Sequence, residues 1–261
     1  MYCIQENDSE NLKKLKVGSK NVNFLMEFPD NDLDKSLSPL MLAAALGHEE
    51  CLKMLLDNPT IDVDIPSENK RYTALAFACL TGNYDIAKML LEKDPEVNRP
   101  TRLNETPLVL SLNRLKQEKN LFENRKIAFK IADLLLVYGA DINWIVDKTK
   151  GYTLLMQLCA ENTRMTEHQK EANLEAIKFL IDRGANREIR CMENKTYLEL
   201  AEQNPNYEEI VSHVKSINGT GSPGLSARHR SRARSVSVDK KKIQLELDKE
   251  RKKCETVSKL K

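Results

Sequence analysis

The chain has 261 residues, of which 41% are apolar and 31% charged, a composition ordinary for a globular domain with a tail. Its longest apolar run, residues 40–46, is far shorter than the roughly 18 residues that cross a bilayer, and no apolar segment follows the acidic N-terminus. We therefore expect neither a membrane span nor a secretory signal, and a location in the cytoplasm or also the nucleus.

The formal net charge of +2 is divided unevenly along the chain. Residues 218–261 hold 13 Lys and Arg against 5 Asp and Glu, a net +8, whereas residues 1–217 hold 28 against 34, a net −6. An acidic body thus carries a basic tail, which is a separate functional question.

Cysteine and histidine are scattered singly. The six cysteines form no C-x-x-C pair, and the four histidines lack the spacing of metal ligands. We expect reduced thiols, no metal site and no cofactor.

The first 35 residues are largely polar, with apolar residues interspersed at 12–15 and concentrated at 22–26. We interpret them, together with residues 32–34, as a divergent capping unit whose outer face is polar.

A start signal, Ser or Thr followed by apolar residues, recurs five times from residue 36 onward. The starts are Ser38, Thr73, Thr106, Thr153 and Thr196. Their spacings of 35, 33, 47 and 43 residues indicate a basic period of 33. Roughly 12 extra residues fall in the third unit, around 113–124, and roughly 10 in the fourth, around 162–172, between the two helices of each unit.

Each part of a unit has a physical role. The starting Ser or Thr can cap the first helix, and Pro39 and Pro107 suit the next position because no N–H is needed there. Small residues such as Ala43 let neighbouring helices approach closely. Gly139 and Gly184 suit a left-handed helix end.

This pattern resembles the ankyrin repeat over roughly residues 36–217, most closely at residues 38–48 and at the Gly-Ala pairs 139–140 and 184–185. The resemblance implies an all-α solenoid of stacked helix-turn-helix units joined by β-hairpin turns. The family's His after Thr-Pro-Leu is replaced by Met41, Ala76, Val109, Met156 and Glu199. Pro59 and Asp94 stand where Gly is usual, so we expect degenerate repeats that couple weakly.

The resemblance also implies a monomeric scaffold that binds a protein partner through its hairpin tips and the first helices on the concave face. The tip positions are Asn69, Lys70, Tyr72, Arg102, Leu103, Glu105, Thr149, Lys150, Tyr152, Met192, Glu193 and Lys195. Leu46, Leu80 and Thr81 are expected to line the groove. The alternative for most of them is a merely solvated side chain, because few residues carry the energy of an interface.

Tyr72 and Tyr152 are the anchors we favour among these positions, since both are large and amphipathic and we expect little core there. Their replacement by Ala would then weaken partner binding without lowering the melting temperature.

The two insertions are expected to stand side by side as a ridge on the edge opposite the hairpins. Leu115, Leu121 and Phe122 would pack one insertion against the other. The ridge is either a second contact surface or a tolerated surface elaboration.

Arg precedes Ser231, Ser235 and Ser237 by three residues each, a pattern typical of sites for basophilic kinases. The same run could serve as a nuclear import signal or contact nucleic acid. Residues 218–261 contain no aromatic residue for base stacking, so we expect only salt-sensitive contact with nucleic acid. Residues 218–238 are predicted to be a flexible linker and 239–261 a charged helix.

Enzyme signatures are missing from the sequence. It contains no Gly-rich phosphate loop, no G-x-S-x-G and no kinase motifs. We therefore expect a non-enzymatic scaffold or adaptor; the alternative is a nuclear or nucleic-acid-associated regulator that uses the basic tail.

Overall fold

The computed structural model describes residues 2–6, 8, 22–27, 34–116, 121–161 and 165–219. The chain divides into two compact units, Met1–His213 and Val214–Lys261. The predicted kinase sites, most of the linker and the 239–261 helix lie outside the described residues. No described helix is long and apolar enough to span a bilayer.

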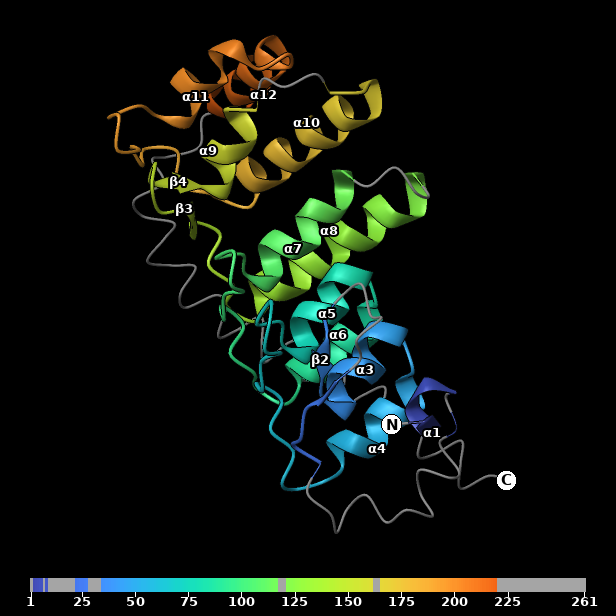
Figure 1. Ribbon diagram of the computed structural model, residues 1–261. Coiled ribbons are helices and arrows are strands. Elements are labelled where there is room, and N and C mark those ends of the chain that lie inside the picture. Colours follow the sequence, from blue (N-terminus) through green and yellow to red (C-terminus); the bar gives the residue numbers. More distant parts are fainter. Residues whose placement is uncertain are drawn as a thin grey trace. The chain divides into compact units, whose positions relative to one another are not determined.

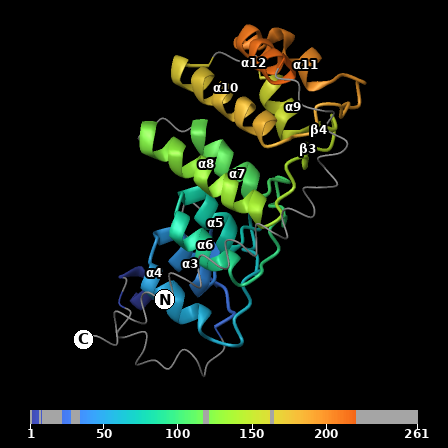
Figure 2. The same cartoon turned by 180° about the vertical axis from the view of Figure 1, so that it is seen from behind.

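Helix pairs follow one another in chain order through the first unit (Figures 1 and 2). The pairs are α3 (Pro39–Leu46) with α4 (Glu49–Leu56), α5 (Ala74–Thr81) with α6 (Tyr84–Leu91), α7 (Pro107–Asn113) with α8 (Leu121–Val137), α9 (Leu154–Cys159) with α10 (Glu167–Asp182), and α11 (Tyr197–Leu200) with α12 (Tyr207–Gly219). The 3-10 turns η2 (Arg114–Lys116) and η3 (Ala201–Gln203) follow α7 and α11.

Short strands accompany these helices. After α1 (Tyr2–Gln5), strand β1 (Met26–Glu27) pairs antiparallel with β2 (Ser36–Leu37), which leads into α3. Strand β3 (Ile145–Asp147) pairs antiparallel with β4 (Tyr152–Thr153), which leads into α9.

All five predicted start residues lie immediately before a first helix. The hydroxyls of Ser38, Thr73, Thr153 and Thr196 each accept the backbone N–H three residues on, as predicted. The prediction is wrong for Thr106, whose buried hydroxyl makes no capping hydrogen bond although its backbone is extended like the others. Nothing in the structure explains this exception.

The first helices stack closely. Helix α5 packs against α3 on one side and α7 on the other, and the second helices α4, α6 and α8 follow in the same order. Ala43, Ala44, Ala78 and Cys79 are fully buried at these contacts, because side chains this small let the backbones approach. The predicted close approach is confirmed.

A ladder of Asn and Asp side chains joins the loops that follow the second helices. The side-chain oxygens of Asn23, Asp64, Asn98 and Asn143 accept backbone N–H groups of residues 62, 96, 141 and 186, at 2.7–3.0 Å. Each bond runs from one unit to the next, so these side chains provide inter-unit hydrogen bonds in units that lack the family's His.

The insertions, predicted to fall between the two helices of each unit, mainly lengthen the second helices. Helices α8 and α10 have 17 and 16 residues, against 8 in α4 and α6. Thr166 begins α10 early because its hydroxyl accepts from Gln169 N while the Gln169 side chain accepts from Thr166 N, a capping box. Helix α12 also continues through Gly219, so the predicted linker begins as helix.

The stacking changes between the third and fourth units. Helices α7 and α9 approach less closely than α3 and α5 or α5 and α7, and η2 contacts α10 instead. We call this boundary the α7–α9 seam.

Gly82 ends α5 in the left-handed conformation (φ 79°), where an added Cβ would lie 2.5–2.7 Å from the Arg114 guanidinium. That guanidinium donates to Leu80 O at 3.0 Å, so Gly82→Ala would displace it and strain the backbone. We expect Gly82→Ala to lower the free energy of unfolding by about 2–3 kcal/mol in urea titrations.

Gly139→Ala is the matched control, since this glycine (φ 93°) has no atom within 4 Å of an added Cβ. We expect this change to lower the free energy of unfolding by about 1 kcal/mol, because it introduces backbone strain alone. Equal costs at the two sites would contradict the role assigned to Arg114.

Candidate protein-interaction surface

A left-handed residue shapes each hairpin tip, two positions before the start of a unit. Arg71, Asn104, Gly151 and Asn194 have φ values of 59°, 63°, 72° and 61°. Asn and Gly tolerate this conformation well. The repeated geometry turns each loop back toward its first helix and leaves the preceding residues at the tip.

Backbone hydrogen bonds join neighbouring tips. Arg102 N donates to Lys70 O and Met192 N to Lys150 O, both at 2.9 Å. Asn104 Nδ2 donates to Ile145 O at 2.7 Å. The loops 67–72, 101–105, 145–152 and 191–195, which we call the tip row, are therefore connected along the stack.

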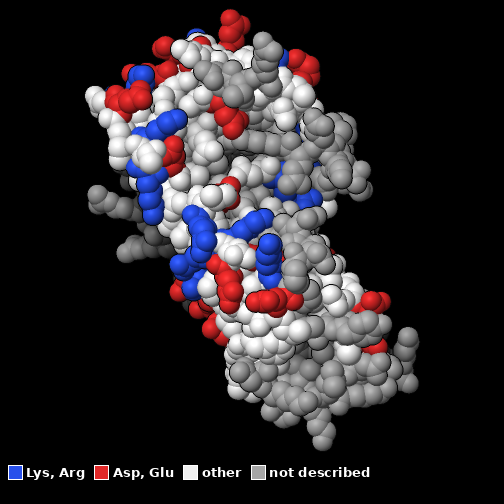
Figure 3. Space-filling model, viewed as in Figure 1, with Lys and Arg blue, Asp and Glu red and all other residues white. Residues whose placement is uncertain are grey.

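Most side chains predicted at the tips are exposed there: Asn69, Lys70, Arg102, Leu103, Thr149, Lys150, Met192, Glu193 and Lys195. Glu105 is half-buried, as are Leu80 and Thr81 at the end of α5, while Leu46 is exposed at the end of α3. Figure 3 shows basic and acidic side chains intermingled on the side where β3 and β4 lie in Figure 1.

The placement predicted for Tyr72 and Tyr152 is wrong. Each has 8% of its surface exposed, and the Tyr72 ring packs edge-on against Phe77 with centroids 5.2 Å apart. Lys70 Nζ and Lys150 Nζ lie over the two tyrosine rings, 5.8 and 5.4 Å from the centroids. Burial raises the pKa of both phenols. The loop turns these rings toward the core, where they support the tips. The interaction surface therefore consists of the exposed tip residues that cover the rings.

Asp34, which belongs to the predicted capping unit, is buried beneath the first tip. Its carboxylate accepts from Ser67 Oγ (2.6 Å), Lys70 N (2.9 Å), Asn69 Nδ2 (3.2 Å) and Ser36 N (3.3 Å). Burial acts to raise the pKa of Asp34, but these hydrogen bonds outweigh it and hold the pKa below its ordinary value. The charged carboxylate therefore fixes the loop that presents Asn69 and Lys70.

A groove of about 610 Å³ opens on the tip side of the α7–α9 seam. Its lining combines the tip at 102–105, the β3 hairpin and the outer face of α9. The lining residues are Arg102, Leu103, Asn104, Glu105, Val146, Asp147, Lys148, Lys150, Tyr152, Gln157, Ala160 and Glu161. Five of them belong to the predicted tip positions, so the structure brings these together in one concave site.

Lys148 and Gln157 are groove residues that the sequence interpretation missed. The sequence Asp147-Lys148-Thr149 is a turn signal that could have been recognised, since the Asp147 carboxylate accepts from Thr149 N at 2.8 Å. Gln157 occupies the fifth position of its unit, where the other units have Leu42, Phe77, Leu110 and Leu200. A polar residue at a position otherwise apolar was the available signal.

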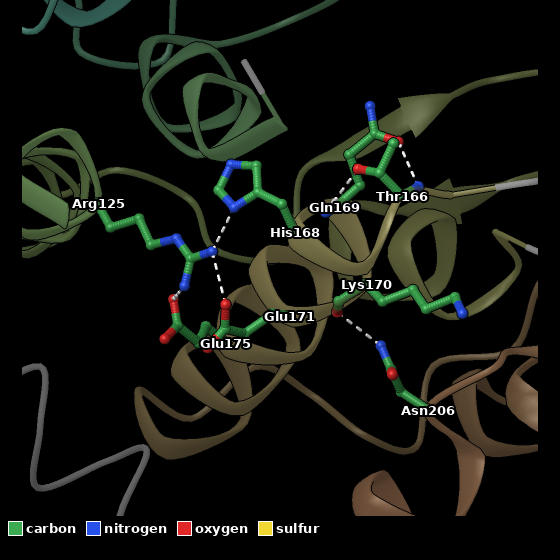
Figure 4. A network of polar contacts seen from close by, with 8 residues as sticks. All are labelled: Arg125, Thr166, His168, Gln169, Lys170, Glu171, Glu175 and Asn206. Atoms are coloured by element: carbon green, nitrogen blue, oxygen red, sulfur yellow. Dashed lines mark hydrogen bonds and ion pairs between the residues drawn. The ribbon is translucent and has the colours of Figure 1, made fainter. Parts of the chain in front are cut away.

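The lengthened helices meet through a buried guanidinium (Figure 4). Arg125 on α8 reaches Glu171 (2.9 Å) and Glu175 (3.3 Å) on α10, and its Nη2 donates to His168 Nδ1 at 2.5 Å. Leu115 on η2 is buried, in line with its predicted packing role, whereas the side chains of Leu121 and Phe122 lie outside the described residues. The described part of the insertions thus forms a packed contact between units.

Reactive chemistry has little support within the described part of the chain. No three His, Cys, Asp or Glu side chains gather there as a metal site requires. Burial raises the pKa of the Cys79 and Cys159 thiols well above its ordinary value, which keeps both protonated.

The stacked two-helix units, the hairpin tips and the capped first helices together define an all-α repeat solenoid. Residues 1–101 match the family model for ankyrin repeats, in three copies. This match confirms the predicted resemblance to the ankyrin-repeat family and the predicted fold class. Domains of this family are generally protein–protein interaction modules and typically non-enzymatic.

One curated relative is the human transient receptor potential cation channel subfamily A member 1, which is 33% identical over 94 residues. The alignment covers 36% of this chain and 8% of the channel. The chain thus corresponds to a small part of that relative.

Replacing Tyr72 or Tyr152 by Ala should destabilise the fold, contrary to the expectation from sequence. Each change removes a buried ring, and we expect a loss of about 2–4 kcal/mol in chemical denaturation. The matched controls Lys70→Ala and Lys150→Ala remove only the exposed cations above the rings and should cost less than about 1 kcal/mol. A tyrosine variant as stable as its lysine control would contradict the supporting role.

Asp34→Ala should destabilise the protein by about 2–3 kcal/mol at neutral pH, because charge-assisted hydrogen bonds are lost. The folded-state pKa of Asp34 lies below its unfolded value, so its contribution is present above about pH 4 and is lost as the pH falls through the folded pKa. Urea titrations of the wild type and of Asp34→Ala between pH 7 and pH 2.5 should therefore show a difference in the free energy of unfolding that becomes smaller as the pH falls. If this difference in the free energy of unfolding did not change with pH, the charged form of the Asp34 carboxylate could not be its cause.

Proposed function

We propose that this protein is a non-enzymatic scaffold or adaptor that binds a protein partner through the exposed side of the tip row and the adjoining ends of the first helices. It needs no cofactor. The general role of ankyrin repeats supports this proposal, as does the ordered presentation of the tips.

The observation that carries the proposal is the exposure of large apolar side chains on the tip row. Leu103, Met192 and Ile145 are 75%, 71% and 46% exposed. Apolar surface left in water is unfavourable, and its concentration on one ordered surface is typical of a contact site. Polar and charged neighbours such as Asn69 and Glu193 surround these side chains.

The basic C-terminal tail adds a second part to the proposal. We infer that a basophilic kinase modifies Ser231, Ser235 and Ser237, and that the protein acts as a monomer in the cytoplasm or also the nucleus. The support is the Arg three residues before each serine.

The test is proximity labelling in cells with the full chain and with the double variant Leu103→Ser/Met192→Ser. Truncating two exposed anchors should lower recovery of specific partners at least about fivefold, since anchor residues typically contribute 1–2 kcal/mol each. The melting temperature should not change, because both side chains are exposed.

The control is Phe24→Ser/Met26→Ser, which removes two exposed apolar side chains outside the tip row. If partners were still labelled by Leu103→Ser/Met192→Ser but were no longer labelled by Phe24→Ser/Met26→Ser, the binding surface would lie outside the tip row.

A further inference from the structure

The groove at the α7–α9 seam is lined by three cations and three anions whose environments differ. Arg102, Lys148 and Lys150 are exposed, whereas Glu105, Asp147 and Glu161 are half-buried. The three cations are therefore more exposed than the three anions, although the formal charges of the lining sum to zero.

The carboxylates already accept hydrogen bonds from this chain. Glu105 accepts from Asn113 Nδ2 at 2.9 Å, and Glu161 from Asn173 Nδ2 at 2.8 Å. Asp147 Oδ1 accepts from Thr149 Oγ1 and from the backbone N–H groups of Thr149 and Lys150, at 2.6–3.2 Å, which lowers its pKa. These groups hold the hairpin and the helices in place.

The side chains of Arg102 and Lys150 contact neutral groups, and Lys150 also interacts electrostatically with Asp147 and Glu193. Arg102 Nη2 donates to the Glu68 carbonyl at 3.3 Å, and Lys150 Nζ lies over the Tyr152 ring. Most of their N–H donors remain available, and a guanidinium can bind a carboxylate through two parallel hydrogen bonds.

Two further features of the lining bear on the ligand. Leu103 and Val146 line the groove, and the exposed Ile145 stands beside Val146. Gln157 Oε1 lies buried in the lining without a hydrogen-bond partner among the described residues. An apolar side chain of the ligand would be covered by the first group, whereas the buried Gln157 oxygen is closed to a ligand.

We propose that this groove binds an extended segment of the protein partner that carries acidic and large apolar side chains, an inference that rests on the function proposed above. Carboxylates of the segment pair with Arg102, Lys148 and Lys150, and an apolar side chain covers Leu103. The chain's own tail does not fit, because its net charge of +8 is repelled by the same cations.

The test uses a random peptide display library selected against the full chain, followed by fluorescence anisotropy with the enriched peptides. Selection should yield net acidic peptides that contain a large apolar residue. Lys148→Glu/Lys150→Glu should weaken their binding about tenfold, and added salt should weaken the wild-type complex.

Lys93→Glu/Lys130→Glu is the matched control. It changes the net charge by the same amount at two exposed lysines outside the groove lining, and it should leave affinity within about twofold.

Several results would overturn the proposal. They are selection of neutral or basic peptides, failure to enrich any peptide over the charge-reversed variant, and acidic peptides that bind that variant as tightly as the wild type. Binding to phosphatidylserine vesicles that depends on Lys148 and Lys150, without peptide binding, would assign the cations to a lipid surface instead. Peptides that depend on Met192 but ignore Lys148 and Lys150 would overturn the groove assignment and leave the proposed function standing.

Discussion

Helices α3 and α5 are apolar on almost every side, and this constraint determines the rest of the structure. Six consecutive residues are buried in α3 and six in α5. A helix buried in this way needs a neighbour on each side, which its own unit cannot supply. Stacking provides the neighbours, and it requires the small residues at Ala43, Ala78 and Cys79 that allow close approach. The hairpins that join the units then project at regular intervals, so the tip row is a consequence of how the core is covered.

The α7–α9 seam shows what happens where this constraint is relaxed. Gln157 stands at a position that is apolar in the other units, and α9 lies farther from α7 than α7 does from α5. The lengthened helices compensate on the opposite side: Asp133 pairs with Arg183, and the Phe129 and Phe179 rings lie 4.9 Å apart. The same seam is therefore held by side-chain contacts on one side and open as a groove on the other.

Sequence reasoning predicted well what depends on local spacing. The starts, four of the five hydroxyl caps and the small-residue contacts follow from the order of residues along the chain, because the capping hydroxyl and the N–H it accepts are three residues apart. The tyrosines show the limit. Their position along the hairpin was evident, but the side to which each ring turns depends on the left-handed residue before it, Arg71 or Gly151. The groove could not be predicted from the sequence for another reason, since it depends on the separation of two helices that are far apart in sequence.

The buried tyrosines change how the surface above them can act. A lysine over an aromatic ring is restrained by that contact, so less conformational entropy is lost when a ligand engages it. Lys70 and Lys150 both lie over such rings, and each backbone carbonyl also accepts a hydrogen bond from the neighbouring tip. The tips are thereby ordered before any partner arrives, although they are loops. Pre-organised cations favour acidic ligands, and the groove, where the restrained Lys150 lies with Arg102 and Lys148, is the part of the tip row where charge and shape act together.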